Sequence, residues 1–535
     1  MNSSSAMTAH FDVYGYPECD YHVKLQVGET MMNLVLDTGS SNTAVISDRC
    51  DSSNCTFVQE PHLPVHPEAL VNRVSARYGN AKTRSSWHGY ATGQSIHFGN
   101  DKSATARVDA ITSSNHFFVP RCPQNQGLWG LAYSKLQTRP HHGRYLNHEL
   151  SSETLFDATR KQLHVPDAFS FQLCPSSVVD PLAAHGLSLI SDDTSRALDE
   201  HRKSKEPSCN GSRVGHFWLG GYSSQSIQSP ITWVSLIDSH YYEVVIDAFL
   251  VNGHPVDMHD DLNKPRTIVD TGTNDIILST ENLHRLLMAL WKSNVIQFDR
   301  RYISPEYERA FWLEHAQLTL PSRAVKLDNR SNVSVSLSGQ AIPIPLENLV
   351  KIHPVLEETS MSWINISWTG LSHGGGTRMA GTILGNTLMR GKTTIWDRGG
   401  RRLGFAEADP MACCQPSAAN AVDKLLSIDD TLIATSSIHP NIHNMLESSS
   451  PFSSVDPGAR FVHVLMLGLM IAACLGGLIH MGWMVWQHYY TKHKEEEKKQ
   501  LEKFISEKRP PVIKIELPMP AHVCSDGDDD FEFIY

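Results

Sequence analysis

Two aspartates lie inside apolar stretches of the chain and share the same local sequence. Asp37 stands in "NLVLDTGSSNTAV", residues 33–45, and Asp270 stands in "TIVDTGTNDIIL", residues 267–278. A lone carboxylate buried in an apolar strand costs several kcal/mol of folding free energy. If the two Asp-Thr-Gly turns instead face each other, the like charges cannot both ionise, and one carboxyl keeps a proton that the other loses. One pair would then supply both an acid and a base.

Such a pair can hydrolyse an amide without a metal, a cofactor or a covalent intermediate. The ionised carboxylate would take a proton from a bound water, while the protonated carboxyl polarises the substrate carbonyl. Gly39 and Gly272 would let the backbone pass close and donate N–H groups to the carboxylates. The hydroxyls of Ser40 and Thr273 would orient the outer carboxyl oxygens.

Residues 11–412, which must position this pair, consist mostly of short apolar or alternating runs separated by Gly, Pro, Asn and Asp. This pattern is typical of a mainly β fold. Residues 280–293 have helical apolar spacing behind a Thr cap and predict one short helix. Each half of the chain also has an apolar-apolar-Gly element after its Asp-Thr-Gly motif, at residues 128–130 and 383–385. The repeated order indicates a duplication with a shared site between two lobes.

Together these motifs resemble the pepsin family of aspartic proteases over nearly all of residues 11–412. The stretches "GLWGLAY", "FSFQLC", "YYEVVI" and "RRLGFA" are also similar to their counterparts in that family. The resemblance implies a mainly β, bilobal pepsin-like fold with an active-site cleft between the lobes and a β-hairpin flap. It assigns catalysis to two residues and support to four others: Asp37 and Asp270, with Gly39, Ser40, Gly272 and Thr273.

Two aromatic residues match the flap of one subgroup. Tyr78 matches the family tyrosine that closes over the substrate. Ala44 stands where pepsin-like enzymes have a tryptophan, and the membrane-anchored memapsins, or β-secretases, have alanine there and a flap tryptophan that Trp87 matches. An ordinary cross-strand aromatic pair is the alternative reading of Tyr78 and Trp87. The chain resembles this membrane-anchored subgroup most closely, since "DTGSSNTAV", the predicted stalk and the single span also favour it. Cys50 and Cys55 instead resemble a small disulfide loop of soluble pepsins, a departure that leaves the substrate open.

Cysteine usage points to an oxidising compartment. Eight of the ten cysteines precede the long apolar stretch near the C-terminus, an even number that suggests disulfides. Cys50 and Cys55 are close enough to bridge one tight loop, and the resemblance implies that Cys174 pairs with Cys413 or Cys414. N-glycosylation triplets begin at five candidate positions: Asn54, Asn210, Asn329, Asn332 and Asn365.

The apolar stretch at residues 461–486 is long enough to cross a bilayer. Aromatic residues flank its far end and many lysines follow, so we expect the preceding residues in the lumen or outside the cell, at the endosome, Golgi or cell surface. Residues 1–15 lack the pattern of a signal peptide, so we expect a signal and a pro-segment to be missing.

Gly468, Ala472 and Gly476 recur on one helix face and suggest a homodimer. A monomeric span with incidental small residues is the alternative.

The predicted molecule is a membrane-anchored aspartic endopeptidase with an acidic pH optimum that acts on membrane or lumenal proteins. A catalytically silent binding protein of the same fold is the alternative, and the two intact acids argue against it. The predicted segments are an N-terminal lobe (11–175), an exposed inter-lobe insertion (176–214), a C-terminal lobe (215–412), a stalk (413–460), a transmembrane helix (461–486) and a cytosolic tail (487–535).

Other functions fit the sequence less well. The net charge of −11, without a dense basic block, argues against a nucleic-acid partner. Ser372 in "GLSHG" fits a nucleophile elbow, but a poor helix start follows it. The stretch "GNTLMRGKT" from Gly385 has one residue too many for a phosphate-binding loop and suggests no helix. No metal motif is predicted, since His141 and His142 are adjacent in a Pro-flanked loop.

Overall fold

The computed structural model describes residues 8–79, 85–99, 101–138, 153–190, 213–328, 330–355, 362–374 and 381–414, with 422 and 424–425. All of them belong to one compact unit that ends at Ile433. The predicted span at 461–486, the tail, and the residues of the predicted dimer face lie outside this set. Within the described ranges, no helix is long and apolar enough to cross a membrane.

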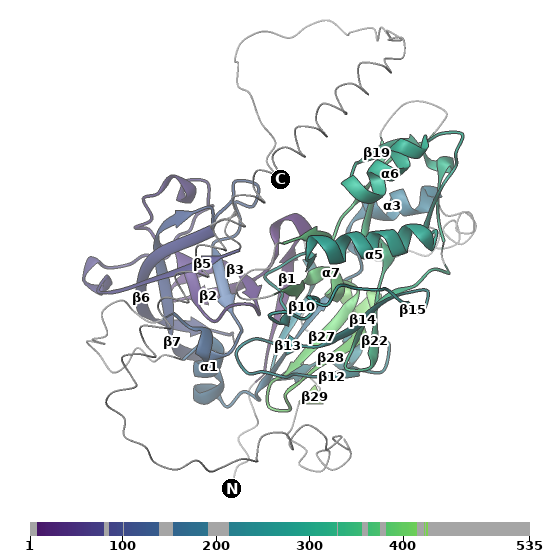
Figure 1. The fold of residues 1–535 in the computed structure, drawn as a ribbon. Coiled ribbons are helices and arrows are strands. Elements are labelled where there is room, and N and C mark those ends of the chain that lie inside the picture. The colour runs from purple at the N-terminus through teal and green to yellow at the C-terminus, as the bar shows by residue number, and fades with distance from the viewer. Residues whose placement is uncertain are drawn as a thin grey trace, which may run out of the picture. The chain divides into compact units, whose positions relative to one another are not determined.

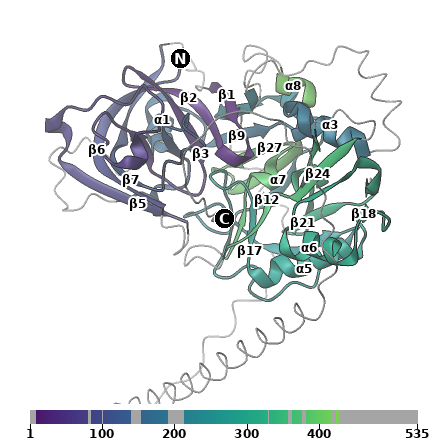
Figure 2. The same ribbon diagram turned by 90° about the horizontal axis from the view of Figure 1, so that it is seen from above.

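A thirteen-stranded sheet runs through the unit and joins its two halves. In both views the strands of the first half, purple to blue, lie at one end and helices α5 (Thr280–Lys292) and α6 (Pro305–Glu314) at the other (Figures 1 and 2). Strands β1 (Ala9–Gly15) and β27 (Lys392–Asp397) lie between them. The order across the sheet is β12 (Thr232–Ser235), β28 (Arg402–Glu407), β27 (Lys392–Asp397), β9 (Ala168–Leu173), β10 (Arg213–Leu219), β1 (Ala9–Gly15), β2 (Tyr21–Val27), β3 (Thr30–Asp37), β8 (Gly127–Gly130), β4 (Thr43–Ile46), β7 (Ser103–Asn115), β6 (Ser85–His97) and β5 (Asn72–Tyr78).

Smaller sheets complete the second half of the chain. One contains β13 (Glu243–Val244), β16 (Thr267–Val269), β26 (Thr382–Leu384), β17 (Ile276–Leu278) and β25 (Leu371–His373). The others contain β15 (His254–Pro255), β14 (Ile246–Val251), β21 (Val333–Leu337) and β22 (Gln340–Ile344); β19 (Leu318–Pro321), β24 (Trp363–Trp368) and β23 (Val350–Val355); β18 (Ile296–Phe298) and β20 (Val325–Leu327); and β11 (Gly221–Tyr222) and β29 (Lys424–Leu425).

The same strand arrangement occurs once in each half. In the first half, β8 pairs in parallel with β3 and antiparallel with β4, and β4 pairs in parallel with β7. In the second half, β26 pairs in parallel with β16 and antiparallel with β17, and β17 pairs in parallel with β25. The first Asp-Thr-Gly turn connects β3 to β4, and the second connects β16 to β17. The repeat in the sequence is therefore a repeat in topology.

Helices in the described ranges are few and short. The predicted helix at 280–293 is observed as α5, but its cap is Ser279, whose side chain accepts a hydrogen bond from the Asn282 N–H. The first part of the predicted insertion forms α2 and α3, and α3 lies against β23, where Gly186 approaches the Ile352 carbonyl closely. The helices are α1 (Leu155–Leu163), α2 (Ser176–Val179), α3 (Pro181–Ile190), α5 (Thr280–Lys292), α6 (Pro305–Glu314), α7 (Asn386–Met389) and α8 (Pro410–Cys414).

A line of buried aromatic rings crosses the junction between the halves. Trp129 of β8 lies edge-on to Phe217 of β10, with ring centroids 5.4 Å apart. Phe169 of β9 contacts Phe217 and stacks on Trp396 of β27 at 5.1 Å. All four side chains are fully buried. Since buried aromatic pairs stabilise a core beyond the area they bury, this line fixes the two halves against each other and sets the geometry between their Asp-Thr-Gly turns.

Candidate active site

The two aspartates lie at the ends of equivalent strands and face each other. Asp37 is the last residue of β3, and Asp270 directly follows β16. Each is 7% exposed. A Cβ atom placed on Gly39 would lie 2.7 Å from the Asp270 carboxyl, and one placed on Gly272 would lie 2.5 Å from Asp37 Oδ1 and 3.3 Å from Asp270 Oδ1. Only glycine fits at these two positions, because each turn packs directly on the opposite carboxyl group.

Each carboxylate accepts the same pair of hydrogen bonds. The Gly39 N–H donates to Asp37 Oδ1 at 2.8 Å, and the Gly272 N–H donates to Asp270 Oδ1 at 2.9 Å. The Ser40 hydroxyl donates to Asp37 Oδ2, and the Thr273 hydroxyl donates to Asp270 Oδ2 at 2.7 Å. The structure therefore places these four support residues, predicted from the sequence, around the two aspartates.

The threonines of the two motifs hold the turns together, a role that the sequence did not predict. The Thr38 N–H donates to Thr271 Oγ1 at 3.0 Å, and the Thr271 N–H donates to Thr38 Oγ1 at 2.9 Å. Each hydroxyl then donates across the interface, from Thr38 to the Val269 carbonyl and from Thr271 to the Leu36 carbonyl. These four buried bonds lock the turns in register. The repeated Asp-Thr-Gly motif was the only signal that could have suggested them.

Burial and mutual repulsion change the protonation of the pair. Removal from water raises the pKa of Asp37, and the neighbouring charge of Asp270 raises it further. The hydrogen bonds from Ser40 and Gly39 lower the pKa again, but less. Because a raised pKa favours the protonated carboxyl, Asp37 holds the proton more readily than an exposed aspartate does. The arrangement can therefore present an acid and a base side by side.

The residues directly after the two apolar-apolar-Gly elements donate hydrogen bonds to the Asp-Thr-Gly turns. The Leu131 N–H donates to the Asp37 carbonyl at 2.7 Å, and the Ala132 N–H donates to the Ser40 carbonyl at 2.9 Å. In the second half, the Asn386 N–H donates to the Thr273 carbonyl, and its side-chain amide donates to the Thr271 carbonyl, both at 2.8 Å. The sequence suggested no helix after Gly385. The structure instead shows α7, a single turn that starts at Asn386 and presents these donors.

The two predicted flap residues interact directly. Tyr78 ends β5, and Trp87 lies on the adjacent strand β6. The fully buried indole of Trp87 donates from Nε1 to the Tyr78 hydroxyl at 3.2 Å. A side-chain hydrogen bond also connects Tyr78 with Ser40, and burial followed by the charge of Asp37 raises the pKa of the Tyr78 hydroxyl. The hairpin is thus connected, through Ser40, to the carboxyl group of Asp37.

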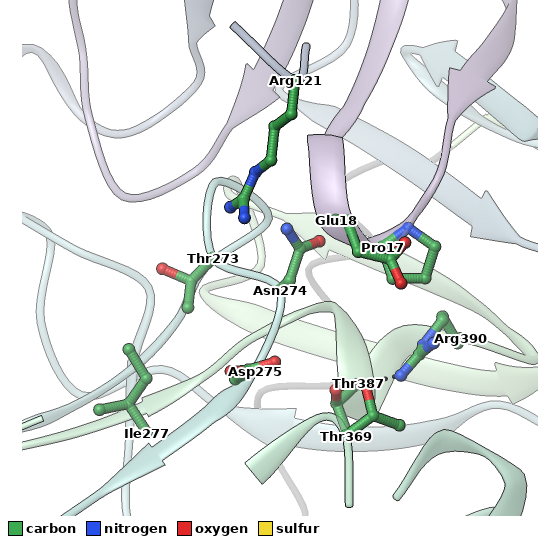
Figure 3. Close-up of a pocket in the computed structure, with 10 residues that line it drawn as sticks. All are labelled: Pro17, Glu18, Arg121, Thr273, Asn274, Asp275, Ile277, Thr369, Thr387 and Arg390. Atoms are coloured by element: carbon green, nitrogen blue, oxygen red, sulfur yellow. Dashed lines mark hydrogen bonds between the residues drawn. The ribbon is translucent and has the colours of Figure 1, made fainter. Parts of the chain in front are cut away.

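A cavity of about 340 Å³ lies next to Thr273. Its lining combines both charges with hydroxyl and amide groups, and Figure 3 shows Arg121 reaching toward Asn274, with Glu18 beside them and Arg390 on the far side. Thr273, which lines the cavity, also donates its hydroxyl to Asp270, so one residue separates the cavity from the aspartate pair. The residues that line it are Pro17, Glu18, Arg121, Thr273, Asn274, Asp275, Ile277, Thr369, Thr387 and Arg390.

A third acid near the pair was not singled out from the sequence. The Asn274 side-chain amide donates to Asp20 Oδ1 at 2.5 Å. Burial raises the pKa of Asp20 to about 6; the bond from Asn274 lowers it, and the nearby charge of Asp270 raises it. The carboxyl connects the loop before β2 to the loop after Asp270. No sequence motif marks it, since Asp20 and Asn274 meet only in the folded chain.

The predicted disulfides include two that the structure contains. Cys50 is bonded to Cys55, and Cys174 is bonded to Cys413 rather than to Cys414. A third bond, between Cys19 and Cys122, had no predicted pairing. It joins residues 103 positions apart and anchors the loop that carries Asp20.

The remaining candidates lie away from the aspartate pair or outside the described residues. Ser372 is part of strand β25, and its side chain hydrogen-bonds Asp275. Among the glycosylation candidates, Asn332 is exposed, and Asn54 and Asn365 are partly exposed. Two candidates, Asn210 and Asn329, and the adjacent histidines His141 and His142 fall outside the described residues.

A repeated β fold with two facing aspartates defines an aspartic-type endopeptidase as the class of protein. The family model described as eukaryotic aspartyl protease matches residues 20–177 and 206–408. The chain therefore belongs to the eukaryotic aspartyl protease family, which confirms the resemblance drawn from the sequence.

Curated relatives are distant. The chain is 24% identical over 308 residues to a protein named Beta-secretase from Strongylocentrotus purpuratus, over 56% of this chain and 49% of that protein. It is 23% identical over 407 residues to Gastricsin from Mus musculus, over 74% of this chain and 83% of that protein. Gastricsin from Rattus norvegicus is 22% identical over 405 residues. The chain thus matches about half the length of the sea-urchin relative.

Proposed function

We propose that this chain is a membrane-anchored aspartic endopeptidase that hydrolyses peptide bonds with a water activated between Asp37 and Asp270. One observation carries the proposal. The two carboxyl groups face each other across turns that are hydrogen-bonded to one another, and each carboxyl is oriented by the same two donors. Lumenal or membrane-bound proteins are the proposed substrates.

The proposed mechanism follows from the shared proton. The ionised carboxylate removes a proton from water, and the resulting hydroxide attacks the peptide carbonyl carbon. The protonated carboxyl donates a hydrogen bond to the carbonyl oxygen as negative charge develops there. Proton transfer to the amide nitrogen then releases the amine product. Gly39, Ser40, Gly272 and Thr273 keep the carboxyl groups oriented throughout.

The proposed acidic pH optimum comes from the family resemblance, and the need to keep one carboxyl protonated sets only the upper pH limit of activity. The pKa of Asp37 is raised above its ordinary value. As the pH rises through this value, the pair loses its proton and activity falls. As the pH falls far enough to protonate both carboxyls, the base is lost and activity falls again. A bell-shaped profile of kcat/KM against pH is the expected result.

Substrate recognition is proposed to involve the flap and the mixed-charge cavity. Tyr78 and Trp87 would close over the peptide backbone, while the cavity beside Thr273 would take one substrate side chain. Its lining offers Arg121 and Arg390 together with Glu18 and Asp275. A polar side chain suits such a lining better than an aliphatic one, because charged and polar groups resist desolvation by apolar atoms.

The test incubates the purified protein with a mixed peptide library between pH 3 and pH 8. Wild-type protein should cleave peptides at acidic pH, and Asp37→Asn and Asp270→Asn should each abolish cleavage, since an amide can neither share the proton nor act as base. Ser372→Ala serves as a control that separates this mechanism from a serine hydrolase and should retain activity. If wild-type protein binds peptides but cleaves none, the silent binding protein is the correct reading.

A further inference from the structure

A second cluster of reactive side chains lies on the strands that join the two halves. His10 and Asp12 are two residues apart on β1, so both side chains leave the same face of that strand. The antiparallel register places Asp12 opposite His216 of β10. One ring nitrogen of each histidine and one carboxylate oxygen of Asp12 all lie within 4.8 Å of one another. Three such groups can bind one metal ion if they move closer to the spacing of a coordination sphere.

The hydrogen bonds of His216 fix which of its ring nitrogens carries the proton. His216 Nε2 lies 3.2 Å from the Ala412 carbonyl oxygen, which can only accept, so Nε2 is the protonated nitrogen. In a neutral imidazole the lone pair is then on Nδ1. That atom lies 2.9 Å from His10 Nε2 and 3.4 Å from Asp12 Oδ1. Without a metal, His10 Nε2 therefore carries a proton and donates it to His216 Nδ1, and metal binding requires His10 to move this proton to its other ring nitrogen. A histidine that binds a metal through one nitrogen commonly donates the other N–H to a carbonyl in this way.

The distances fit a zinc-sized ion with a small adjustment. Zinc binds imidazole nitrogen at about 2.0–2.1 Å and carboxylate oxygen at about 2.0–2.2 Å, so two ligand atoms of a tetrahedral site are separated by about 3.4 Å. The separation of His216 Nδ1 from Asp12 Oδ1 already has this value. The two histidine nitrogens would need to separate by about half an ångström. The ring of His10 is only partly buried and can make this movement, whereas His216 is fully buried and holds its position.

We propose that His10, Asp12 and His216 bind a divalent transition-metal ion of the zinc class, with water completing the coordination. Two imidazoles and one carboxylate form a common zinc ligand set. The ion would fasten β1 to β10 and, through the bond from His216 to Ala412, to helix α8. That helix carries Cys413, which is bonded to Cys174. The site is structural and lies apart from the aspartate pair.

The positive charge of Arg213 lies beside the proposed metal site. Its Nη1 atom lies 3.4 Å from Asp12 Oδ1, the oxygen assigned to the metal. A guanidinium this close repels a dication and competes for the carboxylate. Removing the charge of Arg213 should therefore strengthen metal binding, whereas removing a ligand should weaken it. Opposite effects at adjacent residues distinguish a specific site from general attraction of the ion to an acidic protein.

No sequence motif marked this cluster, because His10 and His216 are 206 residues apart and meet only through strand pairing.

The test titrates ZnCl₂ into the full chain at neutral pH, after removal of metal by a chelator, and follows binding by calorimetry. His10→Gln and Asp12→Asn should each weaken binding at one site by tenfold or more, and Arg213→Gln should tighten it severalfold. His254→Gln, a change at an exposed histidine of β15, is the matched control and should bind as wild type does. Co²⁺ in place of Zn²⁺ should give the visible absorption bands of a histidine-bound ion in wild type and lose them in His10→Gln.

Folding of each variant is checked by its circular dichroism spectrum, and His10 is preferred to the fully buried His216 because its replacement disturbs less packing. Equal zinc affinity in wild type, His10→Gln and Asp12→Asn would overturn the proposal, as would the absence of zinc binding by the wild-type chain.

Discussion

At the scale of single residues, the opposing carboxyl groups show how two buried acids can be tolerated. Each accepts two hydrogen bonds, from a glycine N–H at Oδ1 and from a hydroxyl at Oδ2. The two groups lie close enough that the charge of Asp270 raises the pKa of Asp37, and a proton shared between them would remove one of the two charges. The donors and the shared proton together offset the cost of burial. Neither acid would have this compensation without the other, so the pair behaves as one unit.

Lys392 presents the opposite case, a buried cation without a comparable compensation. It lies on β27, is 3% exposed, and its cross-strand neighbour is Glu407. Burial lowers the pKa of the Lys392 ammonium to about 7, although the charge of Glu407 acts in the opposite direction. The unfolded chain binds this proton more tightly than the folded chain does. Below pH 7 the buried charge therefore lowers the free energy of unfolding by its full amount. The penalty fades as the pH rises from about 7 toward the ordinary lysine value.

Lys392→Met should therefore stabilise the protein, and most strongly at acidic pH. The pKa shift of Lys392 corresponds to a gain on the order of 5 kcal/mol at pH 5, and the gain should shrink as the pH rises above about 7. Urea unfolding followed by tryptophan fluorescence at pH 5, 7 and 9 measures it. Lys102→Met, a change at an exposed lysine, should have little effect at any pH. A gain that does not vary with pH would show that packing, and not charge, limits stability here.

At the scale of elements, the hairpin of β5 and β6 is coupled to the aspartate pair by a chain of polar contacts. Trp87 donates to the Tyr78 hydroxyl, Tyr78 contacts Ser40, and Ser40 donates to Asp37. The position of the hairpin and the orientation of a carboxyl group are therefore connected. Closure of the hairpin over a substrate should act on the chemistry as well as on binding.

Tyr78→Phe should lower kcat/KM by roughly tenfold through loss of one well-placed hydrogen bond. The fold should be retained, because the ring keeps its contact with Phe117, although the buried Trp87 N–H loses its acceptor and stability should fall by about 1–3 kcal/mol. Steady-state kinetics on a cleaved library peptide measures the loss. Tyr90→Phe is the matched control, since that hydroxyl makes only a long, exposed contact with Arg73. Equal losses in the two variants would contradict a specific role for the flap tyrosine.

The local elements differ in how well the sequence could predict them. Helix α5 was predictable because its apolar residues recur at helical spacing over thirteen residues. The exposed insertion predicted at 176–214 does not anticipate α2 and α3, although 181–190 is largely apolar. The single turn α7 was missed because four residues carry no helical period. Short elements depend on tertiary contacts that a local pattern does not contain.

At the scale of the whole molecule, the duplication was the most informative signal in the sequence. Two matching motifs in matching order were enough to predict two halves and a shared site. The sequence could not predict contacts between residues far apart in the chain, such as Thr38 with Thr271 or Asp20 with Asn274. These contacts arise from how the halves pack. The alternation of apolar residues predicts where each strand lies in the sequence. It does not predict which strand the first contacts across the interface between the two halves.

Membrane anchoring is a prediction about the whole chain. If residues 461–486 span the membrane as proposed, a lysine-reactive reagent that cannot enter intact cells should modify lysines before residue 460 and spare those after residue 490. Peptide mapping by mass spectrometry identifies the modified lysines, and permeabilised cells provide the control in which both groups react. Labelling confined to the lysines after residue 490 would reverse the proposed orientation.

The measurement that tests the central claim most directly is a double-mutant cycle on kcat. It compares wild type, Asp37→Asn, Asp270→Asn and the double variant on one peptide at the pH of maximum activity. If the two carboxyls act as one unit around a shared proton, each single variant should lose at least about 10⁴-fold, and the double variant should lose little more. Losses that multiply in the double variant, or a single variant that keeps substantial activity, would contradict the account.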